Sequence, residues 1–254
     1  MLEHTFIHLP FIGPRTEVQL WRQGILTWED LNHHLGHWPK CVKRREAMQR
    51  ALEESWRHRQ QPTYFHSHLP SSERWRLYGS FRHSCAFLDI ETTGLSSFAY
   101  EISVIGIFDG LHLYQFVNGR NLEEFEEVIY HYDLLVTFNG SRFDLPFITA
   151  SFPNFRFQHA HIDLRFVLHH LGIQGGLKKI EPLFGIHRHA DIRQMGGYEA
   201  VLLWQEYLRG SSEALERLLL YNRADVLNLQ TIMEAAYERL LRRLESRIGK
   251  LLFS

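Results

Sequence analysis

Cysteine, lysine and long apolar runs are all scarce in this chain of 254 residues. Two cysteines, Cys41 and Cys85, are too few for a disulfide framework or a cysteine-based zinc cluster, so we expect a reducing, cytoplasmic setting. No apolar run approaches the ~20 residues of a membrane span, and the N-terminus does not read as a secretory signal. Hydrophobic residues still make up 44% of the chain. The composition therefore excludes a disordered protein and predicts no membrane partner.

A surplus of positive charge is also missing, because 28 basic residues face 29 acidic ones. Only five of the basic residues are lysines, and the rest are arginines, whose planar guanidinium matches phosphate geometry. Residues 1–80 carry a net charge of +3, and the remainder of the chain carries −4. The near-neutral total alone therefore does not decide whether the partner is a polyanion.

The pattern of apolar and polar residues changes near residue 84. Residues 1–80 predict a helical N-terminal extension, in which Thr27 caps a short helix and residues 40–60 form a long polar one. Residues 84–254 predict an α/β domain, a sheet covered by helices. We expect strands at 85–88, 102–108, 111–117 and 133–138, and helices at 121–130, 144–151, 163–171, 176–184, 197–209 and 211–243.

Four carboxylates stand where strands or helices would bring them together. Asp89 and Glu91 are two positions apart at the end of a strand, so both can face one side, and Asp144 follows a later strand. Asp225 lies one helical turn after Tyr221. Each pattern alone is common by chance, but four converging acids would repel one another unless cations neutralised them. Hard oxygen ligands of this kind predict Mg²⁺ or Mn²⁺, and two such ions can clamp a phosphodiester.

Three motifs in this order resemble those of the DEDD 3′–5′ exonucleases on the RNase H-like fold. Asp89-Ile90-Glu91-Thr92-Thr93-Gly94-Leu95 is similar to their first motif, and the stretch from Asn139 to Asp144 is similar to the second, Asn-x-x-x-Phe-Asp. The stretch from Tyr221 to Asp225 matches the tyrosine form of the third, Tyr-x-x-x-Asp, which marks the DEDDy type. The proofreading domains of family-B DNA polymerases share this pattern, and stand-alone bacterial exonucleases of the YprB-like group resemble residues 84–240 most. The resemblance implies an RNase H-like mixed sheet flanked by helices.

The resemblance also implies a role for each motif residue. Asp89, Glu91 and Asp225 would hold one metal ion, Asp89 and Asp144 a second, and Tyr221 would orient the attacking water. Contacts to the terminal nucleotide would come from Thr92, Leu95, Asn139 and Phe143, and we add Lys178 as a candidate phosphate contact. Asp163 is interpreted only as a helix N-cap.

The expected function is a metal-dependent 3′–5′ exonuclease that hydrolyses single-stranded nucleic acid, DNA in preference, to nucleoside 5′-monophosphates. Two alternatives stay open: a ribonuclease that trims RNA 3′ ends with the same site, and a non-catalytic nucleic-acid-binding module. Residues 9–31 are similar to a helix-hairpin-helix element, with Phe11 where the first glycine usually stands. This segment would either offer backbone N–H groups to a phosphate or pack as a helical cap on the core.

Overall fold

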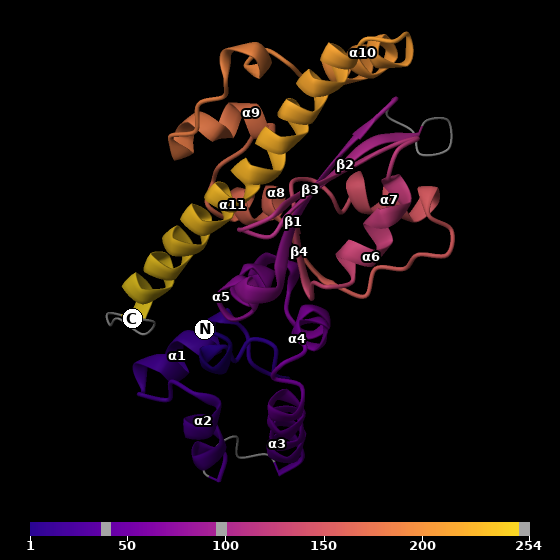
Figure 1. Cartoon of the computed structure of the whole chain (residues 1–254). Helices are drawn as coiled ribbons and strands as arrows, with labels where there is room; N and C mark the ends of the chain where they lie inside the picture. The colour runs from indigo at the N-terminus through magenta and orange to yellow at the C-terminus, as the bar shows by residue number, and fades with distance from the viewer. Residues whose placement is uncertain (37–41, 95–100, 249–254) are drawn as a thin grey trace. The chain divides into compact units, whose positions relative to one another are not determined.

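The computed structural model describes residues 1–36, 42–94 and 101–248. Its contacts divide the chain into two compact units, which we call the helical unit (Met1–His83 with Tyr237–Ser254) and the sheet unit (Ser84–Ala236). Figure 1 shows the elements of each. None of the helices in these described ranges has both the length and the apolar character of a membrane span.

The sheet unit is built on one mixed sheet with the strand order β3-β2-β1-β4-β5. The strands are β1 (Cys85–Thr92), β2 (Ile102–Phe108), β3 (Leu113–Val117), β4 (Leu134–Thr137) and β5 (Ala160–Asp163). β2 runs antiparallel to β1 and β3, whereas β1, β4 and β5 run parallel to one another. β1 is central because its apolar run can be buried on both faces.

Helices cover both faces of this sheet (Figure 1). The helical elements of the unit are η4 (Leu122–Glu124), α6 (Phe125–Ile129), α7 (Asp144–Ser151), α8 (Leu164–His170), α9 (Leu177–Ile180), η5 (Glu181–Phe184), η6 (Ala190–Ile192), α10 (Gly197–Leu208) and most of α11 (Ser212–Ile248). Leu88 and Ile90 of β1 share a buried core with α6 and α7, and Val104 of β2 shares another with α10 and α11. Since side chains alternate along a strand, Asp89 and Glu91 lie on the α11 face.

The helical unit packs short helices around buried aromatic rings. Its elements are η1 (Leu2–His4), α1 (Pro14–Arg22), α2 (Trp28–His34), α3 (Val42–Arg57), α4 (Pro62–His68), η2 (Ser71–Leu77), α5 (Tyr78–Phe81) and η3 (Arg82–Ser84). Trp21, Trp28 and Trp75 are buried in this core. A buried ion pair joins α1 to η2, because Arg76 donates to both carboxylate oxygens of Glu17 at 2.9 Å. Such a pair holds its two elements in one register.

The predicted fold class is confirmed: a mixed sheet flanked by helices, with a helical N-terminal region. Thr27 caps α2 in a capping box with Asp30, as expected. The turn before α1 places Phe11 at a φ of 67°, in the left-handed region that glycine favours. Phe11 thus takes a conformation that would suit the glycine usual at this position of the resembled element, and phosphate binding by residues 9–31 stays a prediction.

One strand was missing from the sequence prediction. β5 pairs in parallel with β4, and Asp163 is its last residue. The short segment lies directly before α8, and its His161 interrupts the apolar pattern, so nothing in the sequence distinguished it from a loop.

Candidate active site

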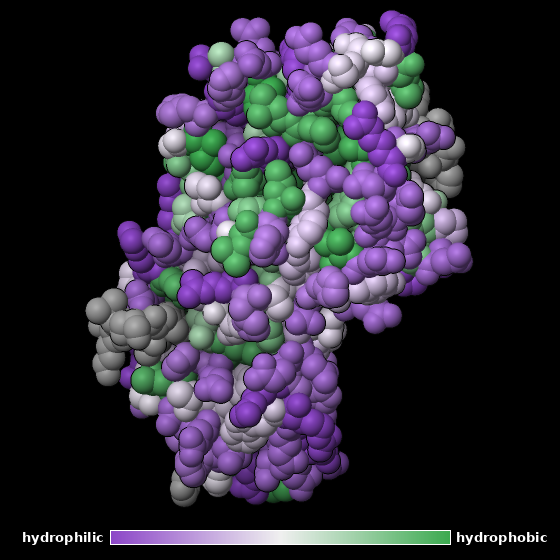
Figure 2. Space-filling model, viewed as in Figure 1, coloured by the Kyte–Doolittle hydropathy of each residue, from purple (hydrophilic) through white to green (hydrophobic). Residues whose placement is uncertain are grey.

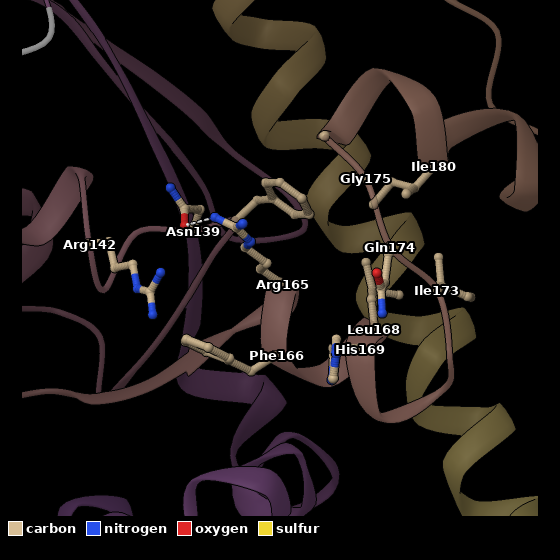
Figure 3. Close-up of a pocket in the computed structure, with 12 residues that line it drawn as sticks. Asn139, Arg142, Arg165, Phe166, Leu168, His169, Ile173, Gln174, Gly175 and Ile180 are labelled. Carbon is tan, nitrogen blue, oxygen red and sulfur yellow. Dashed lines mark hydrogen bonds between the residues drawn. The ribbon is translucent and has the colours of Figure 1, made fainter.

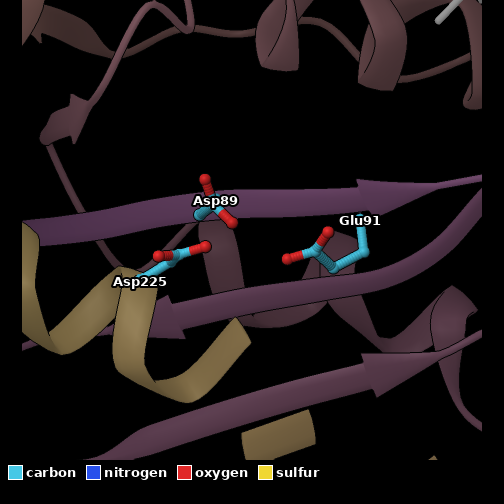
Figure 4. A group of neighbouring side chains, drawn as sticks. All are labelled: Asp89, Glu91 and Asp225. Atoms are coloured by element: carbon cyan, nitrogen blue, oxygen red, sulfur yellow. The ribbon is translucent and has the colours of Figure 1, made fainter. Parts of the chain in front are cut away.

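The carboxylates predicted to meet do so on the α11 face of the sheet. One carboxylate oxygen from each of Asp89, Glu91 and Asp225 lies within 4.8 Å of the others. Figure 4 shows Asp89 and Glu91 projecting from one strand, and Asp225 reaching them from α11. Asp89 is half-buried, whereas Glu91 and Asp225 are almost fully buried. The expectation that residues i and i+2 of this strand face one side is met.

Asp144 reaches the same region from the start of α7. Its Oδ1 accepts a hydrogen bond of 3.1 Å from the backbone N–H of Ile90, the residue between the two β1 acids. All four acids line a cavity of about 740 Å³, together with Thr92, Phe143 and Tyr221. This volume is within the range of ~300–1,000 Å³ that is typical of small-molecule sites.

Crowding of these acids shows in their pKa values. Burial raises the pKa of Asp89 and of Glu91 well above the ordinary values, and the charges of Asp225 and Asp144 raise both further. Burial also raises the pKa of Asp144 to about 7 and that of Asp225 to about 6, although the Arg188 guanidinium opposes the second shift. Because it costs free energy to ionise these carboxylates together, the site favours a bound cation, whose positive charge offsets their repulsion.

The acidic group fits a divalent cation. Its donors are hard carboxylate oxygens, which Mg²⁺ and Mn²⁺ prefer. The buried Oε1 of Glu91 has no hydrogen-bond partner among the described residues, so one ligand atom is left for such an ion. Asp89, Glu91 and Asp225 are the residues that would hold it, and Asp144 lies outside this group of three.

Arg188 is a site residue that the sequence reasoning did not assign. Its guanidinium donates to both oxygens of Glu181, at 2.8 and 2.6 Å, and its Nη2 also donates to Asp225 Oδ1. The Arg188 side chain is almost fully buried, and it lies 5.2 Å from the centre of the Tyr221 ring. Asn228, on the same helix as Asp225, donates to Glu181 at 2.9 Å. No motif signals this arginine, because its partner Asp225 is 37 residues away in the sequence.

Tyr221 lies between the acids and two basic side chains. Burial and then the charge of Asp225 raise the pKa of the Tyr221 phenol, and its hydroxyl makes a hydrogen bond with Asp225. The Lys178 Nζ lies 5.5 Å from the centre of the ring. Lys178 is therefore beside the third motif, although it does not line the acidic cavity.

The loop that carries the second motif (residues 138–143, called the second-motif loop) is held in place by β5, the strand that the sequence did not predict. Asp163, at the end of β5, accepts hydrogen bonds from Asn139 N at 2.8 Å, Ser141 N at 3.2 Å and Ser141 Oγ at 2.6 Å. It also caps α8 through Arg165 N, which confirms its predicted role. Asn139 has a φ of 65°, a left-handed conformation that asparagine tolerates. Asp163 thus does more than cap a helix, because it fixes the loop that precedes Asp144.

The remaining predicted substrate contacts are placed around the cavity. Thr92 and Phe143 line it, and Thr92 Oγ1 donates to the Gly94 carbonyl at 2.6 Å. Asn139 lines it too, with its side-chain oxygen bound by Arg165 at 2.6 Å. Leu95 lies outside the described residues.

The chain belongs to the RNase H superfamily, because the sequence model of that family matches residues 86–237. This matched region contains every strand of the sheet except the first residue of β1, and all four acids. The family and the site together identify a nuclease of the RNase H-like exonuclease type. No curated protein has a matching sequence.

Three solved structures are similar to the chain at low identity. The family B DNA polymerase of the archaeon Pyrobaculum calidifontis has 14% identity and a TM-score of 0.48, over 65% of this chain and 29% of the polymerase. Brucella melitensis NrnC bound to pGG has 19% identity and a TM-score of 0.45, over 69% of this chain and 81% of NrnC. The Aedes aegypti Nibbler EXO domain has 13% identity and a TM-score of 0.46, over 69% of this chain and 92% of that domain.

Proposed function

We propose that the protein is a 3′–5′ exonuclease that removes nucleoside 5′-monophosphates from single-stranded nucleic acid, with DNA as the preferred substrate. The observation that carries this proposal is the convergence of Asp89, Glu91 and Asp225 in a cavity that Tyr221 also lines. These are the residues that the sequence motifs assign to catalysis. The polarity and the products rest on the resemblance of the motifs.

The acids would act by holding two Mg²⁺ or Mn²⁺ ions. Asp89, Glu91 and Asp225 would bind the first, and Asp89 and Asp144 would share the second. When bound, the ions supply positive charge and Lewis acidity at the scissile phosphate. The chain itself fixes the carboxylates in place: β1 holds two of them rigidly, and the Ile90 N–H orients Asp144.

Tyr221 has a positioning role in this proposal. Because its pKa is raised, the phenol stays protonated at neutral pH and cannot act as a general base. Its hydroxyl can instead orient the attacking water. Thr92 and Phe143 on the cavity wall would contact the terminal nucleotide, and Lys178 would contribute positive charge beside the third motif.

The test is hydrolysis of end-labelled single strands of DNA and RNA with Mg²⁺ or Mn²⁺. We expect the wild type to release mononucleotides from the 3′ end, and Asp89→Ala to lower the rate by at least about 10³-fold, because the site loses a carboxylate that would help to hold both ions. Equal rates for Asp89→Ala and wild type would refute the assignment.

Tyr221→Phe separates positioning from metal binding. We expect it to slow hydrolysis by up to about 100-fold, because the water loses its orienting hydroxyl. Mn²⁺ binding, measured by calorimetry, should be retained. A loss of Mn²⁺ binding in Tyr221→Phe would contradict the positioning role.

Faster degradation of RNA than of DNA in the same panel would favour the RNA-trimming alternative. Strand binding without hydrolysis of either polymer would favour the non-catalytic module.

A further inference from the structure

A second cavity adjoins the acidic one on the sheet unit. Its volume is about 660 Å³, and Phe138 and Asn139 form part of the wall of both cavities. Figure 3 shows the side chains that surround it, which come from the second-motif loop, from α8, from the segment before α9 and from the end of α9. The second cavity contains none of the four acids.

The second cavity is lined by basic and aromatic side chains. Arg142, Arg165 and His169 line it, and all three are exposed. Within the described ranges, neither arginine forms an ion pair, so both charges are available to a ligand. Phe166 also lines the cavity and is 43% exposed, and the Arg142 guanidinium lies 5.9 Å from the centre of its ring.

The Asp163 carboxylate, which caps α8 through the backbone N–H of Arg165, forms no ion pair with either arginine in the described part of the chain. Both oxygens of Asp163 accept hydrogen bonds from the second-motif loop or from the start of α8. The Arg165 side chain is held instead by the neutral amide oxygen of Asn139, at 2.6 Å. The cavity therefore presents two guanidinium groups that have no ion-pair partner among the described residues, beside an exposed aromatic ring.

We propose that this cavity binds the part of a single strand that precedes its 3′-terminal nucleotide. Arg142 and Arg165 contact backbone phosphates, and one base stacks on Phe166. Cationic grooves with aromatic platforms bind single strands without reading sequence, because every base offers a stacking face. The shared wall at Phe138 and Asn139 lets one strand occupy both cavities. The placement of the 3′-terminal nucleotide in the acidic cavity rests on the proposed function. The binding of a single strand in the second cavity does not depend on it.

Binding is measured by fluorescence anisotropy with a labelled single-stranded DNA 12-mer, on the Asp89→Ala background so that nothing is hydrolysed. Phe166→Ala should weaken binding by about 5- to 150-fold, the range that corresponds to loss of one stacked base. The double variant Arg142→Gln/Arg165→Gln should lower the slope of log K against log salt by about 1.4, because two phosphate contacts are lost.

Matched controls come from the same unit. Tyr130 is 50% exposed and Arg217 is exposed, and neither lines either cavity. Tyr130→Ala and Arg217→Gln should bind the 12-mer as the background protein does. If Phe166→Ala and the double arginine variant behave like these controls, the second cavity is not a strand site. A poly-glutamate peptide that binds as tightly as the 12-mer would also overturn the proposal, since it has no bases to stack.

Hydrolysis then separates this inference from the proposed function. With Asp89 intact, we compare the 12-mer with thymidine 5′-p-nitrophenyl phosphate, which has no preceding nucleotides. The cavity variants should lose at least about fivefold more kcat/KM on the 12-mer than on the small ester. If the wild type cleaves no polynucleotide, the proposed function fails, and the anisotropy results still decide the cavity. If the wild type cleaves the 12-mer and the variants show no such difference, strand binding by the second cavity is refuted and the proposed function stands.

Discussion

Arg188 gives the cluster of acids a positive charge that belongs to the protein itself. It contacts Asp225 on one side and is held by Glu181 on the other. This arrangement neutralises part of the repulsion that the carboxylates would otherwise feel without a cation. We therefore expect the fold to persist without metal, and the arginine to share Asp225 with any ion that binds.

Replacing Arg188 by methionine should show this role. Arg188→Met leaves Glu181 buried without its partner, so we expect the metal-free protein to lose about 3–5 kcal/mol of unfolding free energy. Mn²⁺ should then stabilise the variant more than the wild type, since the ion replaces the lost charge beside Asp225. Thermal unfolding with Mn²⁺ and with EDTA measures both effects.

The double variant Arg188→Met/Glu181→Gln is the control, because it also removes the unpaired carboxylate. It should recover much of the lost stability in EDTA. If Mn²⁺ raises the melting temperature of Arg188→Met no more than that of the wild type, Arg188 does not act as the counter-charge.

Spacing along the sequence predicted the acids, but not the residues behind them. Asp89 and Glu91 share a face because strand geometry has a period of two, and Tyr221 and Asp225 are one helical turn apart. Both relations are local. Arg188 and Glu181 meet Asp225 only through tertiary packing, so no window of the sequence contains that contact.

At the scale of elements, most helices and the long strands of the sheet unit were predictable and β5 was not, and in the helical unit α4 (Pro62–His68) forms where two prolines had indicated a break. β2 was expected at residues 102–108 and is found there, because seven apolar or small residues in a row read as a buried strand. β5 has four residues, and its strand character comes from pairing with β4. Asp163 was consequently assigned as a cap, and its hold on the second-motif loop was missed.

The close approach of β2 to α11 depends on a glycine. A Cβ on Gly106 would lie 2.3 Å from the side-chain oxygen of Asn222. Asn222 is fully buried, and in the sequence it stands inside the third motif, between Tyr221 and Asp225. Gly106 also pairs with Asp89 across the strands. We expect Gly106→Ala to cost about 1–3 kcal/mol in urea unfolding and to slow hydrolysis, because it displaces the third motif from the first.

A double-mutant cycle with Asn222→Ala checks the cause. The added methyl group should be tolerated better once the Asn222 amide is gone, so the two losses of stability should be less than additive by at least about 0.5 kcal/mol. Additive losses would show that Gly106→Ala acts elsewhere.

At the scale of the molecule, the two units present different surfaces. Figure 2 shows apolar side chains on the face of the sheet unit that is turned to the viewer, and α10 exposes Tyr198, Leu202 and Leu208. The helical unit has a few polar side chains in its core, and His8 is one of them. The His8 ring packs against Trp28 and Phe65, and its Nε2 hydrogen bonds Ser55 Oγ at 2.9 Å.

His8 should make the helical unit sensitive to acid. Burial lowers its pKa to about 3 from an ordinary 6.5, so the unfolded chain binds a proton between these values and the folded chain does not. The stability from neutral His8 is complete above pH 6.5 and is lost as the pH falls. The loss should be about 2 kcal/mol between pH 7 and pH 5.

His8→Gln removes this titration. Urea unfolding of the wild type and the variant at pH 7 and pH 5 isolates the effect, because the other groups contribute equally to both. The variant should lose about 2 kcal/mol less than the wild type over this interval. The same pH dependence in both proteins would contradict a neutral buried His8.

The helical unit is discontinuous along the chain, since Met1–His83 is completed by residues from Tyr237 onward. Tyr237 packs edge-to-face against Trp75 and Tyr78, and its hydroxyl lies where a side chain on Gly79 would be. During synthesis, residues 1–83 leave the ribosome before the part of α11 that completes their unit has been made. The sheet unit, which is continuous, can finish folding first. Residues 1–83 are therefore made before the sheet unit but completed after it.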